Sequence, residues 1–179
     1  MTRLKPFIKY LILFAAAVFA AGRTDHRQRV IDGDTLIVGR ERVRLKGIDA
    51  PEMKQTCLCE GEERKCGVEA KKALIGIIGE KRVSCDSSGR DVYGRLLAEC
   101  FITDGGEKIS LNRMMVRAGM AVVFSKKDES LLIEEADALR ERNGIWGCEK
   151  FEMPADFRKS VRKGVKTVVP PERKPFPSD

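Results

Sequence analysis

Histidine is nearly absent from this sequence, and its scarcity limits the chemistry that the protein can perform. Among 179 residues there is one histidine, His26, which lies near the N-terminus and suits an ordinary surface position. A single histidine excludes mechanisms that need two, such as those of two-histidine ribonucleases and phospholipase-D-like enzymes. Nothing around His26 resembles the sharp turn that presents the serine of a Ser-His-Asp hydrolase. Carboxylates, arginines and a hard metal ion remain as the groups able to carry a reaction.

An excess of charge of one sign is missing from the central part of the chain. Of 34 basic and 27 acidic residues, three basic ones lie in the first 20 positions, and seven basic and three acidic ones lie from Met153 onward. This leaves 24 basic and 24 acidic residues for 21–152, although the whole chain has a net charge of +7. A nucleic-acid partner must therefore be argued from individual residues and not from overall charge.

The ends of the chain differ in composition from its middle. Three basic residues precede an apolar run from Tyr10 to Ala21 that closes in small residues, as in an export signal. This run is shorter than the roughly 20 residues of a spanning helix. We expect residues 1–20 to be a signal peptide, or alternatively an uncleaved membrane anchor, 21–152 to be the folded domain, and 153–179 to be a basic, proline-rich, disordered tail. The protein would then be secreted or periplasmic, or anchored facing away from the cytoplasm.

If the protein is exported, its six cysteines are expected to form disulfides, because thiols outside the cytoplasm tend to pair. One pair brackets the short loop "CLCEGEERKC", and another ends two strand-like runs, so that each can close locally. The "CLC" spacing could also supply metal thiolates, but the Cys-x-x-Cys repeat of zinc sites is absent. We expect three disulfides, namely Cys57 with Cys66, Cys85 with Cys100 and, by elimination, Cys59 with Cys148.

Apolar runs separated by turn residues predict an α+β fold that is mainly β. The runs "QRVI", "DTLIVG" and "RVRLKGI" indicate three strands, and Asp32-Gly33 between the first two is a hairpin signal. Two further strands are expected at 81–85 and 94–102. Helical spacing of apolar residues predicts helices at 67–79, 108–120 and 128–144, the last one capped by Gly144. Five strands with a helix after the third suggest a closed, five-stranded OB-type barrel covered by helices.

Two short segments concentrate carboxylates. "VIDGDT" places Asp32 and Asp34 around a glycine, and "RLKGIDAPE" carries Asp49 and Glu52. Because Asp34 follows a turn and Asp49 ends a strand, a meander could bring both to one rim, where hard oxygen ligands suit Ca²⁺. Aspartate and glycine are also common turn residues, so the pattern alone permits a purely structural role for Asp32.

Five motifs together carry a resemblance to a known family. "VIDGDT", "VRLKGIDAPE", "DVYGRLLAEC", "LNRMMVRAGMA" and "EADALRERNGIWG" occur in the order and at the spacing of the staphylococcal-nuclease-like (thermonuclease) family, over about residues 29–148. The chain resembles an exported, disulfide-bearing member of it. This resemblance implies a Ca²⁺-dependent phosphodiesterase that hydrolyses DNA and RNA to 3′-phosphate products, as a monomer with no obligate protein partner.

The resemblance also implies roles for individual positions. By position, it assigns the Ca²⁺ ligands Asp34, Asp49 and the Ala50 carbonyl, the catalytic residues Arg44, Glu52 and Arg95, and the supporting or substrate-binding residues Asp32, Thr35 and Tyr93. In these roles Glu52 would position or deprotonate the attacking water. The two arginines would grip phosphate oxygens and offset the charge that builds up on phosphorus.

The chain departs from the family's best-known member at the nucleotide pocket. Ser125 and Lys127 stand where that member has tyrosines, and Val92 stands where it has a lysine. Two alternatives therefore stay open. One is a catalytically inactive OB-fold module of the cell envelope that binds nucleic acid or protein, and the other is a structural protein of the envelope.

Overall fold

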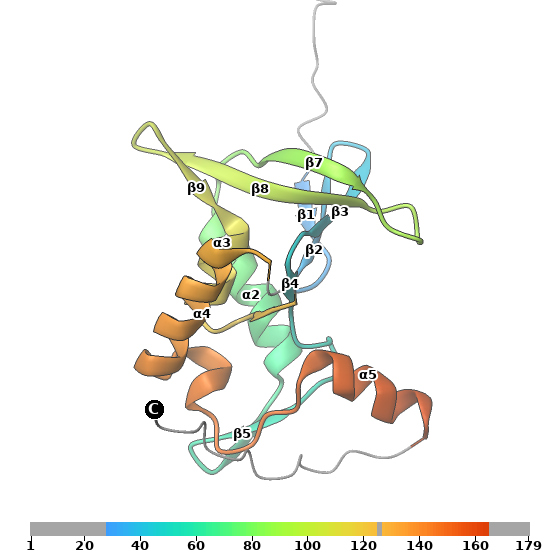
Figure 1. The fold of residues 1–179 in the computed structure, drawn as a ribbon, viewed down its shortest axis with the longest axis vertical. Coiled ribbons are helices and arrows are strands. Elements are labelled where there is room, and N and C mark those ends of the chain that lie inside the picture. The colour runs from blue at the N-terminus through green and yellow to red at the C-terminus, as the bar shows by residue number, and fades with distance from the viewer. Residues whose placement is uncertain (1–27, 125–126, 165–179) are drawn as a thin grey trace, which may run out of the picture.

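Figure 1 shows the fold in a computed structural model, which describes residues 28–124 and 127–164. The strands are β1 (Gln28–Val30), β2 (Thr35–Val38), β3 (Glu41–Leu45), β4 (Ile48–Asp49), β5 (Cys57–Cys59), β6 (Glu62–Arg64), β7 (Ser84–Arg90), β8 (Leu96–Asp104), β9 (Glu107–Ser110) and β10 (Val122–Val123). The helices are α2 (Cys66–Ile78), α3 (Leu111–Arg117), α4 (Glu129–Glu141), a short 3-10 helix (Gly144–Gly147) and α5 (Pro154–Arg162). The expected signal or anchor at 1–20 lies outside the described residues.

The main sheet has the strand order β1-β2-β3-β8-β7, and β9 pairs with β8. The predicted α+β class, mainly β, is confirmed. The expected closed barrel is not, because the strand pairings within the described residues leave this sheet open. One reason is the turn at Gly47 (φ +82°), which splits the third expected strand into β3 and β4. β4 then leaves the main sheet and pairs with β10.

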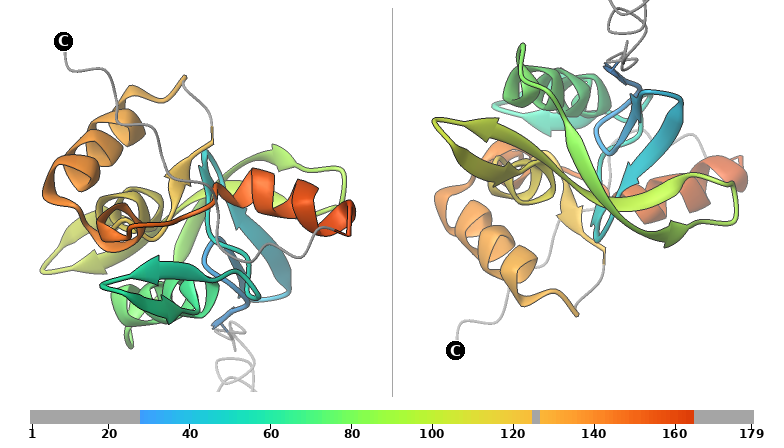
Figure 2. Two further views of the ribbon diagram at one scale, coloured as in Figure 1. Left: turned by 90° about the horizontal axis from the view of Figure 1, so that it is seen from below. Right: turned by 90° about the horizontal axis from the view of Figure 1, so that it is seen from above.

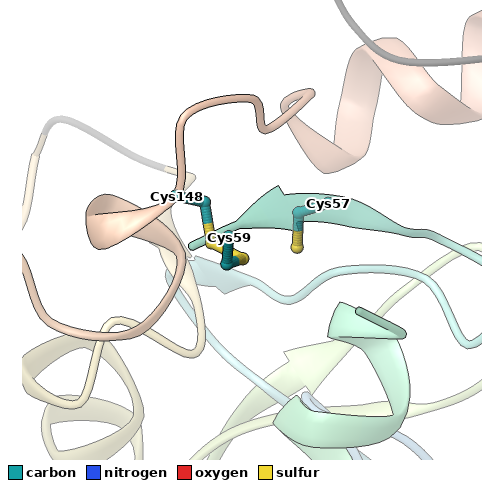
Figure 3. Close-up of side chains that lie close together, drawn as sticks. All are labelled: Cys57, Cys59 and Cys148. Atoms are coloured by element: carbon teal, nitrogen blue, oxygen red, sulfur yellow. A yellow bond between two sulfur atoms is a disulfide. The ribbon is translucent and has the colours of Figure 1, made fainter. Parts of the chain in front are cut away.

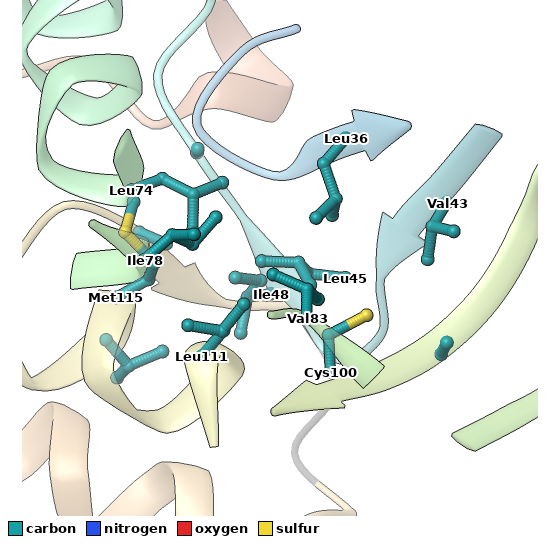
Figure 4. Close-up of a cluster of buried hydrophobic side chains, with 14 of the residues drawn as sticks. Leu36, Val43, Leu45, Ile48, Leu74, Ile78, Val83, Cys100, Leu111 and Met115 are labelled. Carbon is teal, nitrogen blue, oxygen red and sulfur yellow. The ribbon is translucent and has the colours of Figure 1, made fainter. Parts of the chain in front are cut away.

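The hydrophobic core lies between this sheet and helices α2 and α3 (Figure 4). Alternate residues of β8 point inward, with Ala98, Cys100 and Ile102 buried, as the period of two predicts for a sheet with one covered face. Leu74 of α2 and Met115 of α3 are fully buried against them. The core therefore fixes the sheet whose rim carries the candidate site.

The expected helices are present with corrected bounds. The helix expected at 108–120 starts only at Leu111, because the residues before it pair with β8 as β9, and Ser110 accepts a hydrogen bond from the Arg113 amide as the N-cap. The helix expected at 128–144 ends earlier than Gly144, since Arg142 adopts the left-handed cap conformation (φ 56°). Gly144 instead begins the 3-10 helix.

The expected disordered tail is wrong for its first part. Helix α5 (Pro154–Arg162) begins with proline at a first-turn position, where its missing N–H costs no hydrogen bond. Four of the seven basic residues that we assigned to a solvated tail lie in this helix or at its C-cap, namely Arg158, Lys159, Arg162 and Lys163. Residues 165–179 lie outside the described part of the chain.

The three expected disulfides are all present. Cys85 and Cys100 face each other across β7 and β8. Cys57 of β5 is joined to Cys66, the first residue of α2. Cys59 of β5 is joined to Cys148, which follows the 3-10 helix.

In residues 28–124 and 127–164, no helix has the length and apolar character needed to cross a membrane.

The disulfides should differ in their contribution to stability. Cys59 and Cys148 are 89 residues apart, whereas Cys85 and Cys100 are 15 apart. In the chain-entropy model these loops correspond to about 4.5 and about 3 kcal/mol. Replacing both cysteines of a pair by alanine should therefore lower the free energy of unfolding, measured in urea, more for Cys59/Cys148 than for Cys85/Cys100. The reverse order would show that strand pairing, and not loop length, governs their effect.

Candidate active site

The turn between β1 and β2 fixes the position of Asp34. The Ile31 amide donates to the Thr35 carbonyl (2.8 Å), which closes the turn. Asp34 is then held from both sides, because its amide donates to Asp32 Oδ1 (3.1 Å) and its Oδ1 accepts from Thr35 Oγ1 (2.8 Å). Asp32 and Thr35 thus lie directly beside Asp34. Their roles in catalysis stay predictions.

Position 33 has no room for a side chain, so it requires glycine. A Cβ atom built on Gly33 would lie 2.6 Å from the Ala50 Cβ and 2.8 Å from the Ala70 Cβ. The turn therefore packs directly onto Ala50, whose amide donates to Asp34 Oδ2 (3.4 Å). The sequence marks Gly33 as a turn residue, but it gives no sign of this contact.

Arg44 joins the two aspartates that the sequence analysis assigned to a metal. It lies on β3 opposite Thr35, and Asp49 is the last residue of β4. Arg44 Nη2 is 2.9 Å from Asp34 Oδ2 and 2.9 Å from Asp49 Oδ1. The two carboxylate oxygens are therefore separated by at most twice that distance, and both aspartates are buried.

A second arginine, Arg158 of α5, binds the other side of Asp49. Its Nη2 is 2.8 Å from Asp49 Oδ2 and its Nη1 is 3.0 Å from Asp49 Oδ1, and the same Nη1 is 2.8 Å from Glu52 Oε1. These hydrogen bonds, first to Asp49 and then to Glu52, raise the pKa of Arg158. No motif marks Arg158 in the sequence, where it is one of several basic residues near the C-terminus.

Glu52 is held by its backbone, while its carboxylate is partly open to solvent. Its amide donates to Gln55 Oε1 (3.1 Å), its carbonyl accepts from the Gln55 amide (2.7 Å), and its side chain is 41% exposed. Gln55 itself is fully buried and donates to the Glu152 carbonyl (2.6 Å). Gln55 is therefore a second residue that the sequence did not reveal.

Arg95 and Tyr93 lie on the β7–β8 hairpin and bind a different partner. Arg95 Nε donates to Asp91 Oδ2 (2.7 Å), and its guanidinium lies 5.7 Å from the centre of the Tyr93 ring. Tyr93 is 82% exposed, so it does not belong to the core. In the described residues, the polar contacts of the Arg95 side chain are with this hairpin. Arg44, by contrast, contacts the aspartates directly, and Glu52 is linked to Asp49 through Arg158.

The group carries uncompensated negative charge. The group holds four carboxylates, of Asp32, Asp34, Asp49 and Glu52, and two guanidinium groups, of Arg44 and Arg158, which pair with the last three. Burial raises the pKa of Asp34 to about 7, opposed by Arg44 and supported by the charge of Asp32. Asp34 and Asp49 both contact Arg44, and the group has two more carboxylates than guanidinium groups. Hard oxygen ligands with an excess of negative charge fit a divalent metal ion that prefers oxygen.

A cavity of about 670 Å³ adjoins Arg44. It lies between the β3–β4 segment on one side and Phe124 and residues 127–129 on the other, and its lining includes Lys46 and Lys127. Phe124 is 68% exposed, so an aromatic face is available in this cavity although the tyrosines of the family's pocket are absent. Ser125 lies outside the described residues.

Three cysteines form another group with metal-ligating atoms, Cys57, Cys59 and Cys148 (Figure 3). Their sulfur atoms lie within 4.8 Å of one another. All three are disulfide-bonded, Cys59 to Cys148 and Cys57 to Cys66. Because metals bind cysteine as the thiolate, these residues serve here as covalent links.

The buried aspartates and the arginine that joins them are charged groups of the kind that hydrolysis of a phosphodiester can use. Comparison with known proteins gives the family. The family described as "Staphylococcal nuclease homologue" matches residues 42–148. The chain therefore belongs to this family, as its motifs indicated.

Individual relatives carry different names. The chain is 38% identical over 123 residues to the "Succinoglycan biosynthesis protein ExoI" of Rhizobium meliloti (strain 1021), covering 67% of this chain and 63% of that protein. It is 32% identical over 142 residues to an "Uncharacterized endonuclease" of Escherichia coli O157:H7, covering 76% of this chain and 85% of the relative. It is also 32% identical over 144 residues to "Protein ParB" of Escherichia coli, with coverages of 73% and 76%. This chain thus spans less than two thirds of the first of these relatives.

The contact of Gly33 with Ala50 gives a direct test of the site's construction. Gly33→Ala should lower the free energy of unfolding by about 1–3 kcal/mol, because the new methyl group overpacks against Ala50 and Ala70. It should also displace Asp34 and reduce metal affinity. Gly76→Ala is the matched control, since nothing lies within 4 Å of its Cβ and it sits in helix α2. That control should raise stability slightly. Urea denaturation of both variants measures these changes. Equal free energies of unfolding for Gly33→Ala and Gly76→Ala would contradict the close packing at Gly33.

Proposed function

We propose that this protein is a Ca²⁺-dependent nuclease that hydrolyses DNA and RNA to products with 3′-phosphates. The observation that carries the proposal is the convergence of Asp34 and Asp49 on Arg44, with Glu52 next to Asp49 through Arg158. Family membership supports hydrolysis of phosphodiesters, and the name endonuclease of the Escherichia coli relative supports a nucleic-acid substrate.

Asp34 and Asp49 would hold the metal ion, together with the Ala50 carbonyl. The fit rests on two buried hard ligands and on the surplus of negative charge around them. Ca²⁺ suits such a site better than Mg²⁺, which demands near-ideal octahedral geometry and gives up its water reluctantly. When bound, the ion would polarise a phosphoryl oxygen and offset its charge.

The side chains around the aspartates would perform the remaining steps. Glu52, partly exposed, would take the proton from a water molecule that attacks phosphorus. Arg44 would hold a phosphate oxygen with its planar fork and stabilise the charge that develops there. Arg95 would do the same from the β7–β8 hairpin once substrate draws it from Asp91. The bond between phosphorus and the 5′ oxygen would then break, the 5′ oxygen would take a proton from solvent, and the phosphate would stay on the 3′ side.

The cavity beside Arg44 would receive a base of the substrate. Phe124 offers a face for stacking, and Lys46 and Lys127 offer positive charge in the same cavity. Stacking on a single aromatic face tolerates any base, so this cavity would not select one base over another.

The disulfides support a location outside the cytoplasm, where such bonds persist. We propose export through the signal at residues 1–20, and action as a monomer on nucleic acid without an obligate protein partner. The competing candidate, an inactive OB-fold binding module of the envelope, would bind nucleic acid or protein without cleaving it.

Degradation assays test the proposed reaction. Purified protein should degrade DNA and RNA with Ca²⁺, and chelator should abolish this. Arg44→Lys, Arg44→Ala, Glu52→Gln and Arg95→Ala should each lower turnover by about a hundredfold or more, because each removes a group used in the transition state. Arg44→Lys keeps the charge beside the buried aspartates, so that loss of the fork is separated from loss of folding.

Arg113→Ala is the control, since Arg113 forms an ion pair with Glu134 between α3 and α4. It should keep full turnover. Binding of oligonucleotides without any cleavage would support the inactive module instead. Near-normal turnover of one variant would remove that residue from the catalytic set.

The raised pKa of Asp34 predicts how Ca²⁺ binding depends on pH. Below about pH 7 Asp34 holds a proton in the metal-free protein, so the proton competes with the ion. Ca²⁺ affinity measured by calorimetry should therefore be roughly tenfold or more weaker near pH 5.5 than near pH 7.5, with proton release on binding. Asp34→Asn should bind weakly at both pH values and release no proton. Asp86→Asn, at an exposed position on β7, should behave as wild type. Equal wild-type affinity across this range would refute the prediction.

A further inference from the structure

Helix α5 adds a wall to the candidate site that the family match does not include. The match ends at residue 148, and α5 spans Pro154–Arg162. Figures 1 and 2 show α5 next to the segment that leads from β4 to β5. Arg158 reaches from α5 to Asp49 and Glu52, so the helix supplies a cation to the carboxylate group.

The connection to α5 is held firmly, so its position is part of the fold. Cys148 is disulfide-bonded to Cys59, and Leu58 and Lys150 exchange two backbone hydrogen bonds (2.9 and 3.2 Å). Next along the chain, Gln55 binds the Glu152 carbonyl. Three successive attachments therefore tie residues 148–152 to β5 and to the Glu52 loop.

A groove of about 450 Å³ opens between α5 and residues 52–54. Its volume falls within the range of small-ligand sites, about 300–1,000 Å³. Its lining is Glu52, Met53, Lys54, Phe157, Arg158, Val161 and Arg162. Apolar side chains and cations thus occur together in one groove that starts at the candidate catalytic residue Glu52.

The apolar part of the groove is open to solvent. Met53 is 38% exposed and Val161 is 55% exposed. The cations Lys54 and Arg162 stand beside them, whereas the groove's one carboxylate, Glu52, is already paired with Arg158. An occupant with a flat apolar part and a negatively charged part matches this lining.

We propose that this groove binds the nucleotide next to the scissile phosphate in a single-stranded nucleic acid. The base would lie on Met53 and Val161, and the adjacent phosphate would bind Lys54 and Arg162. Single strands are required because a base paired in a duplex cannot turn its face to the groove. This inference rests on the proposed function for the identity of the ligand, but binding and cleavage can be measured separately.

The test is binding of a fluorescently labelled, single-stranded oligodeoxynucleotide in chelator, followed by anisotropy. Arg162→Glu should weaken binding about tenfold, because it places a like charge beside the phosphate. Lys159→Glu is the matched control, since it makes the same charge change on the same helix at an exposed residue that does not line the groove. It should weaken binding less than about twofold.

A second variant removes the apolar contact without changing charge. Met53→Ser/Val161→Ser should weaken binding of the single strand about tenfold, because the apolar surface that would cover the base is lost. Binding of a duplex of the same length should stay unchanged. Because both residues are partly exposed, we expect the variant to keep the wild-type stability. A urea midpoint equal to that of wild type would show that its fold is intact.

The outcomes separate the groove from the catalytic proposal. Equal weakening of binding by Arg162→Glu and Lys159→Glu would indicate general charge attraction and would overturn the proposed groove. Wild-type binding by both groove variants, or no binding by the wild-type protein, would also overturn it. If wild type binds as described but degrades nothing with Ca²⁺, the groove stands and the proposed nuclease function fails. If the groove variants bind as wild type does and the protein still degrades nucleic acid normally, the groove fails and the nuclease function stands.

Discussion

The pairing of the buried Asp49 carboxylate is the interaction on which the site depends. A charge removed from water is tolerated only where partners and hydrogen bonds compensate it. Asp49 has two such partners, Arg44 from β3 and Arg158 from α5, and its side chain is 2% exposed. Because Arg44 also binds Asp34, one carboxylate connects the sheet, the turn before β2 and the C-terminal helix. Removing Asp49 would leave two arginines without their common partner.

Covalent and steric constraints place these charged groups before any ligand arrives. The three disulfides pin β7 to β8 and fasten β5 to both α2 and the segment after the 3-10 helix. The contact of Gly33 with Ala50 sets how closely the Asp34 turn approaches β4. Sites held in this way need little rearrangement on binding, which favours both affinity and catalysis.

The two arginines that the family resemblance selected occupy different situations. Arg44 is already among the aspartates, whereas Arg95 is held by Asp91 on a hairpin next to the exposed Tyr93. Arg158, which no motif selected, pairs directly with Asp49 and Glu52. The proposed site therefore combines a part shared with the family and a part supplied by α5 beyond the matched residues.

Local patterns in the sequence determined much of this protein. The short apolar runs between turn residues predicted the strands of the first hairpin and β8, the apolar spacing predicted α2, and the short cysteine separations predicted two disulfides, since each depends on neighbours along the chain. Motif order likewise selected Asp34, Arg44, Asp49 and Glu52. The tertiary structure decided what depends on distant partners: β9 forms because β8 is beside it, β4 leaves the sheet to meet β10, and residues expected to be disordered become α5. Arg158 contacts Asp49 across 109 positions, and no local pattern of charge or hydrophobicity carries information over such a separation.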